Sequence, residues 1–193
     1  MNQELVEFYR GVGRGPRERT IEDIWSFGHD QLESVHDYIQ WLFPTASPSR
    51  YHPTAPLLDE ETMALFRGDV DLRSRLLRSL EVMLSFFGLE LQIRDEYAPG
   101  IGKAPDYRQR QSQWQGEMNH NLLRLTRILE ALRLLGLETY SVALYYCLQT
   151  IRNEVPRKIA ASTLDYWRRA AGIPGKAAGT SLWERLQVYL RLR

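Results

Sequence analysis

The fold class of this 193-residue chain is decided by the stretch Met118-Asn-His-Asn-Leu-Leu-Arg-Leu-Thr-Arg-Ile-Leu-Glu-Ala-Leu-Arg-Leu-Leu-Gly136. Its leucine and isoleucine residues return every three or four positions, which is the spacing of one face of an α-helix. The closing glycine predicts the end of this helix, because glycine readily adopts the left-handed conformation found after helices. Such a helix buries its apolar stripe only against another layer, so we expect a protein built of packed helices.

Similar patterns predict helices along most of the chain. The broad apolar arc of residues 31–43 predicts a central helix that Pro44 ends, followed by an extended, proline-rich loop over residues 44–56. Further helices are expected up to residue 9, from residue 20, at 58–67, 69–87, 138–153 and 162–171, and from residue 181. Residues 89–94 alternate apolar and polar side chains, so we expect at most one short β-hairpin.

The predicted class is therefore all-α, with a single compact multi-helix domain. We place this domain at residues 4–153. Residues 154–193 are predicted to form a basic C-terminal helical extension that packs on the domain or is appended to it.

Composition places the chain among ordinary globular proteins, since 44% of its residues are hydrophobic and 25% are charged. The single cysteine, Cys147, excludes a disulfide framework and a cysteine-based zinc site. The longest apolar run, residues 142–148, is far shorter than the roughly 20 residues of a membrane span, and the first residues do not resemble a signal peptide. We expect a soluble, cytoplasmic protein.

Charge is distributed unevenly. Residues 1–99 hold 10 Lys and Arg against 17 Asp and Glu, a net charge of −7, whereas residues 100–193 hold 15 against 7, a net charge of +8. In residues 157–193, eight basic residues surround Trp167 and Trp183. This segment keeps open a peripheral contact with an anionic membrane or with a nucleic acid, and of these two partners we expect the membrane rather than the nucleic acid. The simpler alternative is a solvated helix face.

Two Glu-x-x-His pairs, Glu33 with His36 and Glu117 with His120, suggest a metal site. This spacing puts a carboxylate and an imidazole on one helical face, and helical di-metal proteins use two such pairs. A metal-dependent enzyme is therefore one alternative, and a histidine at a helix edge beside a solvated glutamate is the other. The sequence contains no Gly-x-Ser-x-Gly elbow, and we expect neither an enzyme nor a cofactor.

The main candidate site is a polar cluster at the start of the leucine-rich helix. His120, Arg124 and Arg127 are four and then three residues apart, so they form one stripe of the helix. Two guanidinium groups with an imidazole suit a carboxylate or a phosphate. A structural interpretation is also open: Asn119 caps the helix, Arg124 holds a neighbouring loop, and Arg127 pairs with Glu130.

Five strings, in this order, resemble the conserved N-terminal region of the opioid growth factor receptor family: Phe8-Tyr9-x-Gly11, His36-Asp-Tyr-Ile-Gln-Trp-Leu-Phe-Pro44, Met83-Leu-x-Phe-Phe-Gly88, His120-Asn-Leu-Leu-Arg-Leu-Thr-Arg-Ile-Leu129 and Leu134-Leu-Gly-Leu137. The resemblance covers roughly residues 4–150. It implies an all-helical domain and, in the animal receptor, binding of an opioid pentapeptide, association with the nuclear envelope and growth-inhibitory signalling. We expect this 193-residue chain to have no room for the animal receptor's long repeat-bearing tail. The resemblance therefore implies the conserved domain more strongly than it implies the receptor role.

Together these observations predict a non-enzymatic, receptor-like module that binds a peptide or a small anionic ligand where residues 36–44 and 119–127 meet. Its predicted ligand-binding residues are His36, Trp41, Asn119, His120, Asn121, Arg124 and Arg127. In this interpretation Arg124→Ala weakens ligand binding and leaves the melting temperature nearly unchanged. The structural interpretation predicts the reverse. The sequence defines neither the ligand nor the oligomeric state.

Overall fold

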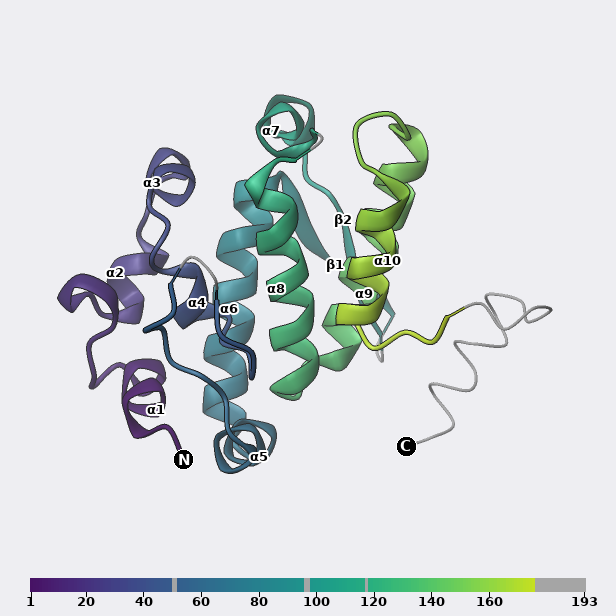
Figure 1. The fold of residues 1–193 in the computed structure, drawn as a ribbon. Coiled ribbons are helices and arrows are strands. Elements are labelled where there is room, and N and C mark those ends of the chain that lie inside the picture. Colours follow the sequence, from purple (N-terminus) through teal and green to yellow (C-terminus); the bar gives the residue numbers. More distant parts are fainter. Residues whose placement is uncertain (50–51, 96–97, 117, 176–193) are drawn as a thin grey trace.

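The computed structural model describes residues 1–49, 52–95, 98–116 and 118–175, and it confirms the all-α prediction (Figure 1). The helices in these residues are α1 (Gln3–Arg10), α2 (Ile21–Trp25), α3 (His29–Ser34), α4 (Ile39–Leu42), α5 (Glu60–Gly68), α6 (Val70–Phe87), α7 (Tyr107–Trp114), α8 (His120–Leu134), α9 (Glu138–Glu154) and α10 (Ala161–Ala170). A short 3-10 helix spans Pro16–Glu18. The expected hairpin is present as antiparallel strands β1 (Leu89–Asp95) and β2 (Ala98–Lys103).

One hydrophobic core joins these elements, from Leu5 in α1 to Trp167 in α10. Helix α8 packs against α9 and α10, and the hairpin packs against α6 and α9. The leucine stripe that predicted α8 is buried, with Leu125, Leu129 and Leu132 at 0% exposure. The predicted amphipathic helix is thus a central element of the fold (Figure 1).

The ends of the long helices follow from local chemistry. The side chain of Asn119 accepts a hydrogen bond from the Asn121 N–H at 2.9 Å and so caps the N-terminus of α8. After α8, Gly136 adopts a φ of +89°, a conformation that glycine reaches without strain and that terminates the helix as predicted. Asp69 caps α6 in the same way as Asn119 caps α8.

The prediction of one helix over residues 31–43 is wrong. The chain forms two short helices instead, α3 and α4, and Val35 between them is extended, with φ −87° and ψ 130°. The break lets Tyr38 turn into the core, where its hydroxyl donates to the Leu32 carbonyl at 2.7 Å. Helical periodicity in the sequence cannot show such a break, because the break is stabilised by groups that are distant in the sequence.

The beginning of the basic extension packs on the main body. Trp167 of α10 is fully buried, and its indole Nε1 donates to the Leu122 carbonyl at 3.1 Å. Residues 176–193, with the last predicted helix and half of the segment's basic residues, lie outside the described residues. The domain boundary at 153/154 therefore stays a prediction.

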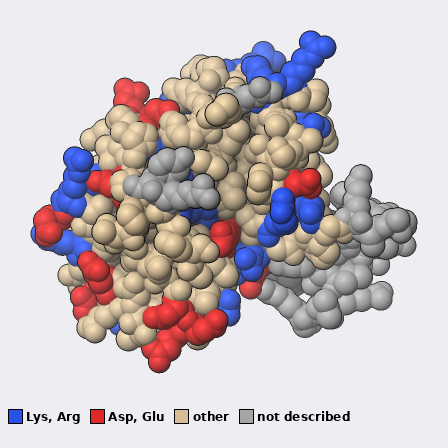
Figure 2. All heavy atoms as spheres, in the orientation of Figure 1, with Lys and Arg blue, Asp and Glu red and all other residues tan. Residues whose placement is uncertain are grey.

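The surface reflects the uneven charge of the sequence. Acidic side chains gather over α5 (Figure 2), whose first turn contains Glu60 and Glu61.

The described helices include none that combines the length and apolar character needed to span a membrane.

Candidate functional site

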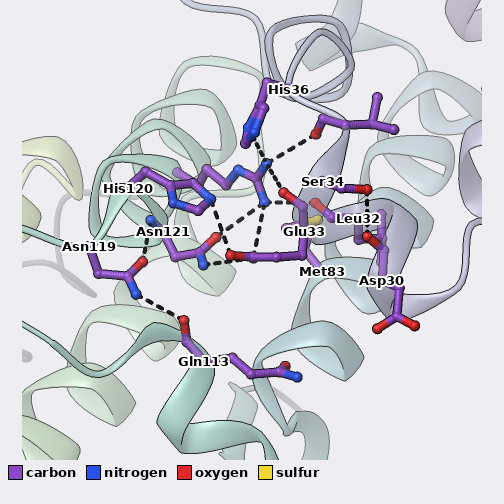
Figure 3. Close-up of polar contacts among 12 residues, drawn as sticks. Asp30, Leu32, Glu33, Ser34, His36, Met83, Gln113, Asn119, His120 and Asn121 are labelled. Atoms are coloured by element: carbon purple, nitrogen blue, oxygen red, sulfur yellow. Dashed lines mark hydrogen bonds and ion pairs between the residues drawn. The ribbon is translucent and has the colours of Figure 1, made fainter.

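The candidate site lies where the α3–α4 segment meets the start of α8 (Figure 3). The side chains of Glu33, His36, His120 and Asn121 point toward one another there. Asn121 Nδ2 donates to Glu33 Oε2 at 3.0 Å, and His120 Nε2 lies 3.6 Å from Glu33 Oε1. The rings of His36 and His120 are 5.3 Å apart and nearly perpendicular, at 80°. The fold thus joins two segments that are more than 80 residues apart in the chain.

Arg124 fastens these segments together. Its guanidinium donates to the carbonyls of Leu32 at 2.7 Å, Val35 at 3.1 Å and Glu33 at 3.3 Å. These carbonyls lie at the C-terminal end of α3, where the break leaves them without helical partners and where a cation complements the helix dipole. It also donates to Asn121 Oδ1 at 3.1 Å. Arg124 is only 4% exposed, so most of its donors serve the protein itself.

Arg127 has a similar role about one turn further along α8. Its Nη1 donates to the Phe43 carbonyl at 3.2 Å, just after α4, and to Thr45 Oγ1 at 3.1 Å. Burial lowers its pKa, and the nearby Glu130 carboxylate raises it. The local pair with Glu130 that the sequence suggested is replaced by contacts to residues more than 80 positions away.

The remaining predicted site residues are placed as follows. Asn119 caps α8 and also donates through Nδ2 to the Gln113 carbonyl at 2.8 Å, which ties α7 to α8. Trp41 is buried against Phe8 of α1, with ring centroids 5.2 Å apart, rather than exposed to a ligand. His36 and His120 are both exposed. The structure therefore brings His36, His120, Asn121 and Arg124 together and leaves Trp41 in the core.

Glu33 belongs to this cluster, although we did not expect it among the ligand-binding residues. Its Glu-x-x-His spacing to His36 was the available signal, but the pattern suggested a metal. The described residues contain no group of three or more His, Cys, Asp and Glu side chains that could hold a metal ion, and Glu117 lies outside them. The di-metal alternative therefore finds no support in this region of the chain.

The surroundings of His120 favour its neutral form. Partial burial lowers the pKa of His120, and the Arg124 cation lowers it further, whereas the Glu33 carboxylate raises it. Glu33 is also 3.9 Å from the Arg124 guanidinium. The exposed face of the cluster consequently offers imidazole nitrogens, with a buried cation behind them.

The chain is similar to known proteins over most of its length. The model of the family described as "Opioid growth factor receptor (OGFr) conserved region" matches residues 3–176. Human opioid growth factor receptor is 37% identical over 171 residues, which cover 84% of this chain and 24% of the human protein. The mouse protein of the same name is 36% identical over 168 residues, covering 84% and 26%. No solved structure matches the chain significantly.

A second group of relatives carries a different name. Opioid growth factor receptor-like protein 1 of Xenopus tropicalis is 32% identical over 153 residues, which cover 76% of this chain and 29% of that protein. The chain spans about a quarter of the length of the curated relatives that it matches first. The matched region runs from α1 through α10 and includes the whole candidate site. The chain belongs to the opioid growth factor receptor family through this conserved region.

Proposed function

We propose that this protein is a non-enzymatic binding module that takes a peptide or a small anionic ligand where residues 36–44 meet residues 119–127. The observation that supports this most is the pair of exposed imidazoles of His36 and His120, 5.3 Å apart in front of the buried Arg124 cation. Exposed N–H donors backed by positive charge favour anionic groups. The curated relatives are named receptors, which agrees with a binding role.

The surface around these imidazoles has features that suit a peptide. On α8, Leu123 lies three residues after His120 and four before Arg127, so the three side chains are neighbours on the helix surface. Leu123 is 58% exposed, so its side chain is accessible to a ligand. An imidazole, an apolar side chain and a guanidinium in this order would recognise a carboxylate beside an apolar group.

The predicted binding residues then divide by what they touch. His36, His120 and Arg127 line the surface and are proposed to contact the ligand. Arg124 and Asn121 are buried, and we assign them to holding the α3–α4 segment in place for it. Asn119 and Trp41, which the sequence grouped with the site, support it indirectly through the helix cap and the core.

The test is to map binding of an opioid pentapeptide on the backbone amide NMR spectrum of the full chain. We expect saturable shifts confined to residues 33–45 and 119–127. A C-terminally amidated form of the pentapeptide should bind more weakly, because it lacks the carboxylate. Shifts confined to other residues would show that the proposed location of the site is wrong. Equal affinity for both forms of the pentapeptide would contradict the anionic character of the proposed ligand.

Membrane contact and signalling remain predictions. In the described portion of the basic extension, Arg168 lies 3.5 Å from Asp165 and donates to the Ile173 carbonyl, so its charge is already engaged. The C-terminal residues that would carry the rest of such a contact lie outside the described ranges.

A further inference from the structure

The tautomer of His36 follows from its neighbour. Nδ1 of His36 lies 3.1 Å from Nη2 of Arg124. A guanidinium has donors and no acceptor, so Nδ1 must accept this hydrogen bond. The proton of the neutral ring is then on Nε2. The exposed edge of His36 therefore carries an N–H donor.

Arg124 holds this arrangement firmly. The same Nη2 also donates to the Val35 carbonyl at 3.1 Å, and Nη1 donates to the Leu32 carbonyl at 2.7 Å. The guanidinium stacks over the Tyr38 ring as well, 5.6 Å from its centroid. Because Arg124 is fixed by these contacts, the His36 ring cannot exchange its acceptor nitrogen for its donor nitrogen without losing a bond. Among the described residues, no side chain or carbonyl accepts from His36 Nε2.

His120 is the second imidazole whose ring is exposed to solvent. Its Nε2 is 3.6 Å from Glu33 Oε1, which is too long for a hydrogen bond. Asn121 already occupies the other oxygen of Glu33. The next acid along the chain, Asp37, is paired with Arg17 and Arg19. Glu33 is thus the carboxylate that opposes the buried Arg124 cation in this cluster, and it also lies beside His120. Among the described residues, no carboxylate forms an ion pair with His36.

We propose that His36 Nε2 and His120 together bind an oxyanion, the carboxylate or phosphate group of the ligand, and that Arg124 is the positioning residue that fixes the donor tautomer of His36. Rings 5.3 Å apart are within reach of two oxygens of one such group, each accepting a bond of about 2.8 Å. This inference rests on the proposed function and names the chemistry of its ligand.

The test is an NMR titration of the four histidine side chains in the full chain, labelled with ¹⁵N. Sodium acetate and inorganic phosphate are added in separate arms at constant ionic strength, with sodium chloride as the control. We expect His36 in the Nε2–H form before addition and saturable shifts at His36 and His120 in at least one arm. The arm with the lower Kd identifies carboxylate or phosphate. His29 and His52 serve as internal controls, and their signals should not saturate.

Two variants separate recognition from structure. His36→Phe keeps a ring of similar size and should weaken oxyanion binding by about tenfold, the loss of one charge-assisted bond. His36→Gln retains an N–H donor near the position of Nε2 and should restore some of the affinity. If His36→Phe disturbs the backbone amide spectrum, His120→Phe is used in its place to measure the loss of oxyanion affinity. His52→Phe is the matched control.

The outcomes distinguish this inference from the proposed function. A Nδ1–H form of His36, or unchanged affinity in both phenylalanine variants, overturns the inference. Shifts at Arg127 and Thr45 without shifts at the histidines also overturn it and leave the proposed module standing. If neither the two anions nor the pentapeptide produces saturable shifts, both proposals fail.

Discussion

Replacing the buried Arg124 with methionine should destabilise the protein more than the same replacement of Arg127, one turn further along α8. The side chain makes two buried hydrogen bonds, to the Leu32 carbonyl and to Asn121 Oδ1. Methionine retains most of the apolar stem but donates nothing. Asn121 Oδ1 then loses its donor, which costs about 1–3 kcal/mol. The Leu32 carbonyl keeps the Tyr38 hydroxyl and loses about 1 kcal/mol, so the two together cost about 2–4 kcal/mol.

The other acceptors add less. The carbonyls of Glu33 and Val35 are only partly buried, so water can replace Arg124 there at small cost. We therefore expect the free energy of unfolding to fall by about 3 kcal/mol and the melting temperature by about 6–12 °C for a chain of this size. The assay is urea unfolding followed by circular dichroism, with linear extrapolation to water.

Two further variants make the measurement specific. Arg124→Lys keeps the charge but cannot form the forked contacts, so about half of the loss should remain. Arg127→Met removes two partly buried bonds, to the Phe43 carbonyl and Thr45, and should cost about 1 kcal/mol. If Arg124→Met costs no more than Arg127→Met, the carbonyls of the α3–α4 break do not depend on Arg124 and the reasoning fails.

Three other results are expected. Acidification should destabilise the protein, because burial lowers the pKa of His120 and of His29 below the ordinary value of 6.5 and the unfolded chain therefore binds more protons than the folded chain as the pH falls through that value. His120→Phe should weaken the pH dependence of the free energy of unfolding, measured in urea between pH 7 and pH 5. An unaltered pH dependence in this variant would show that other groups cause it. Trp167→Ala should cost about 3–5 kcal/mol, because the indole is fully buried and hydrogen-bonded, and a loss under 1 kcal/mol would show that α10 is merely appended. If residues 176–193 contact membranes, binding to phosphatidylserine vesicles should fall with added salt and on removal of those residues, and binding insensitive to both would refute the contact.

Much of the fold was predictable because its long helices are strongly amphipathic. The spacing of leucines in α8 and the glycine at position 136 predicted both the helix and its end. The segment 31–43 failed for the opposite reason: its side chains suit a helix, but the carbonyls released by the break are bound by Arg124, about 90 residues further on. Local periodicity contains no information about a donor so distant.

The contact between the two segments of the candidate site was predictable, and the role of each residue in it was not. The stripe of His120, Arg124 and Arg127 showed which face of α8 is polar, and the resemblance paired it with the segment after His36. Sequence spacing could not show that Arg124 is buried while His36 and His120 remain exposed. It also favoured a local pair of Arg127 with Glu130 over the observed contact with Phe43, which only the tertiary fold creates.

The most direct test of the central claim, that the α3–α4 segment and α8 together form a ligand site, is isothermal titration calorimetry. An opioid pentapeptide is titrated into the full chain, into the double variant His36→Phe/His120→Phe and into His52→Phe. We predict saturable binding to the full chain, an affinity at least about tenfold weaker in the double variant and an unchanged affinity in the control. Equal affinity in all three proteins would contradict the account, as would no measurable heat of binding to the unaltered chain.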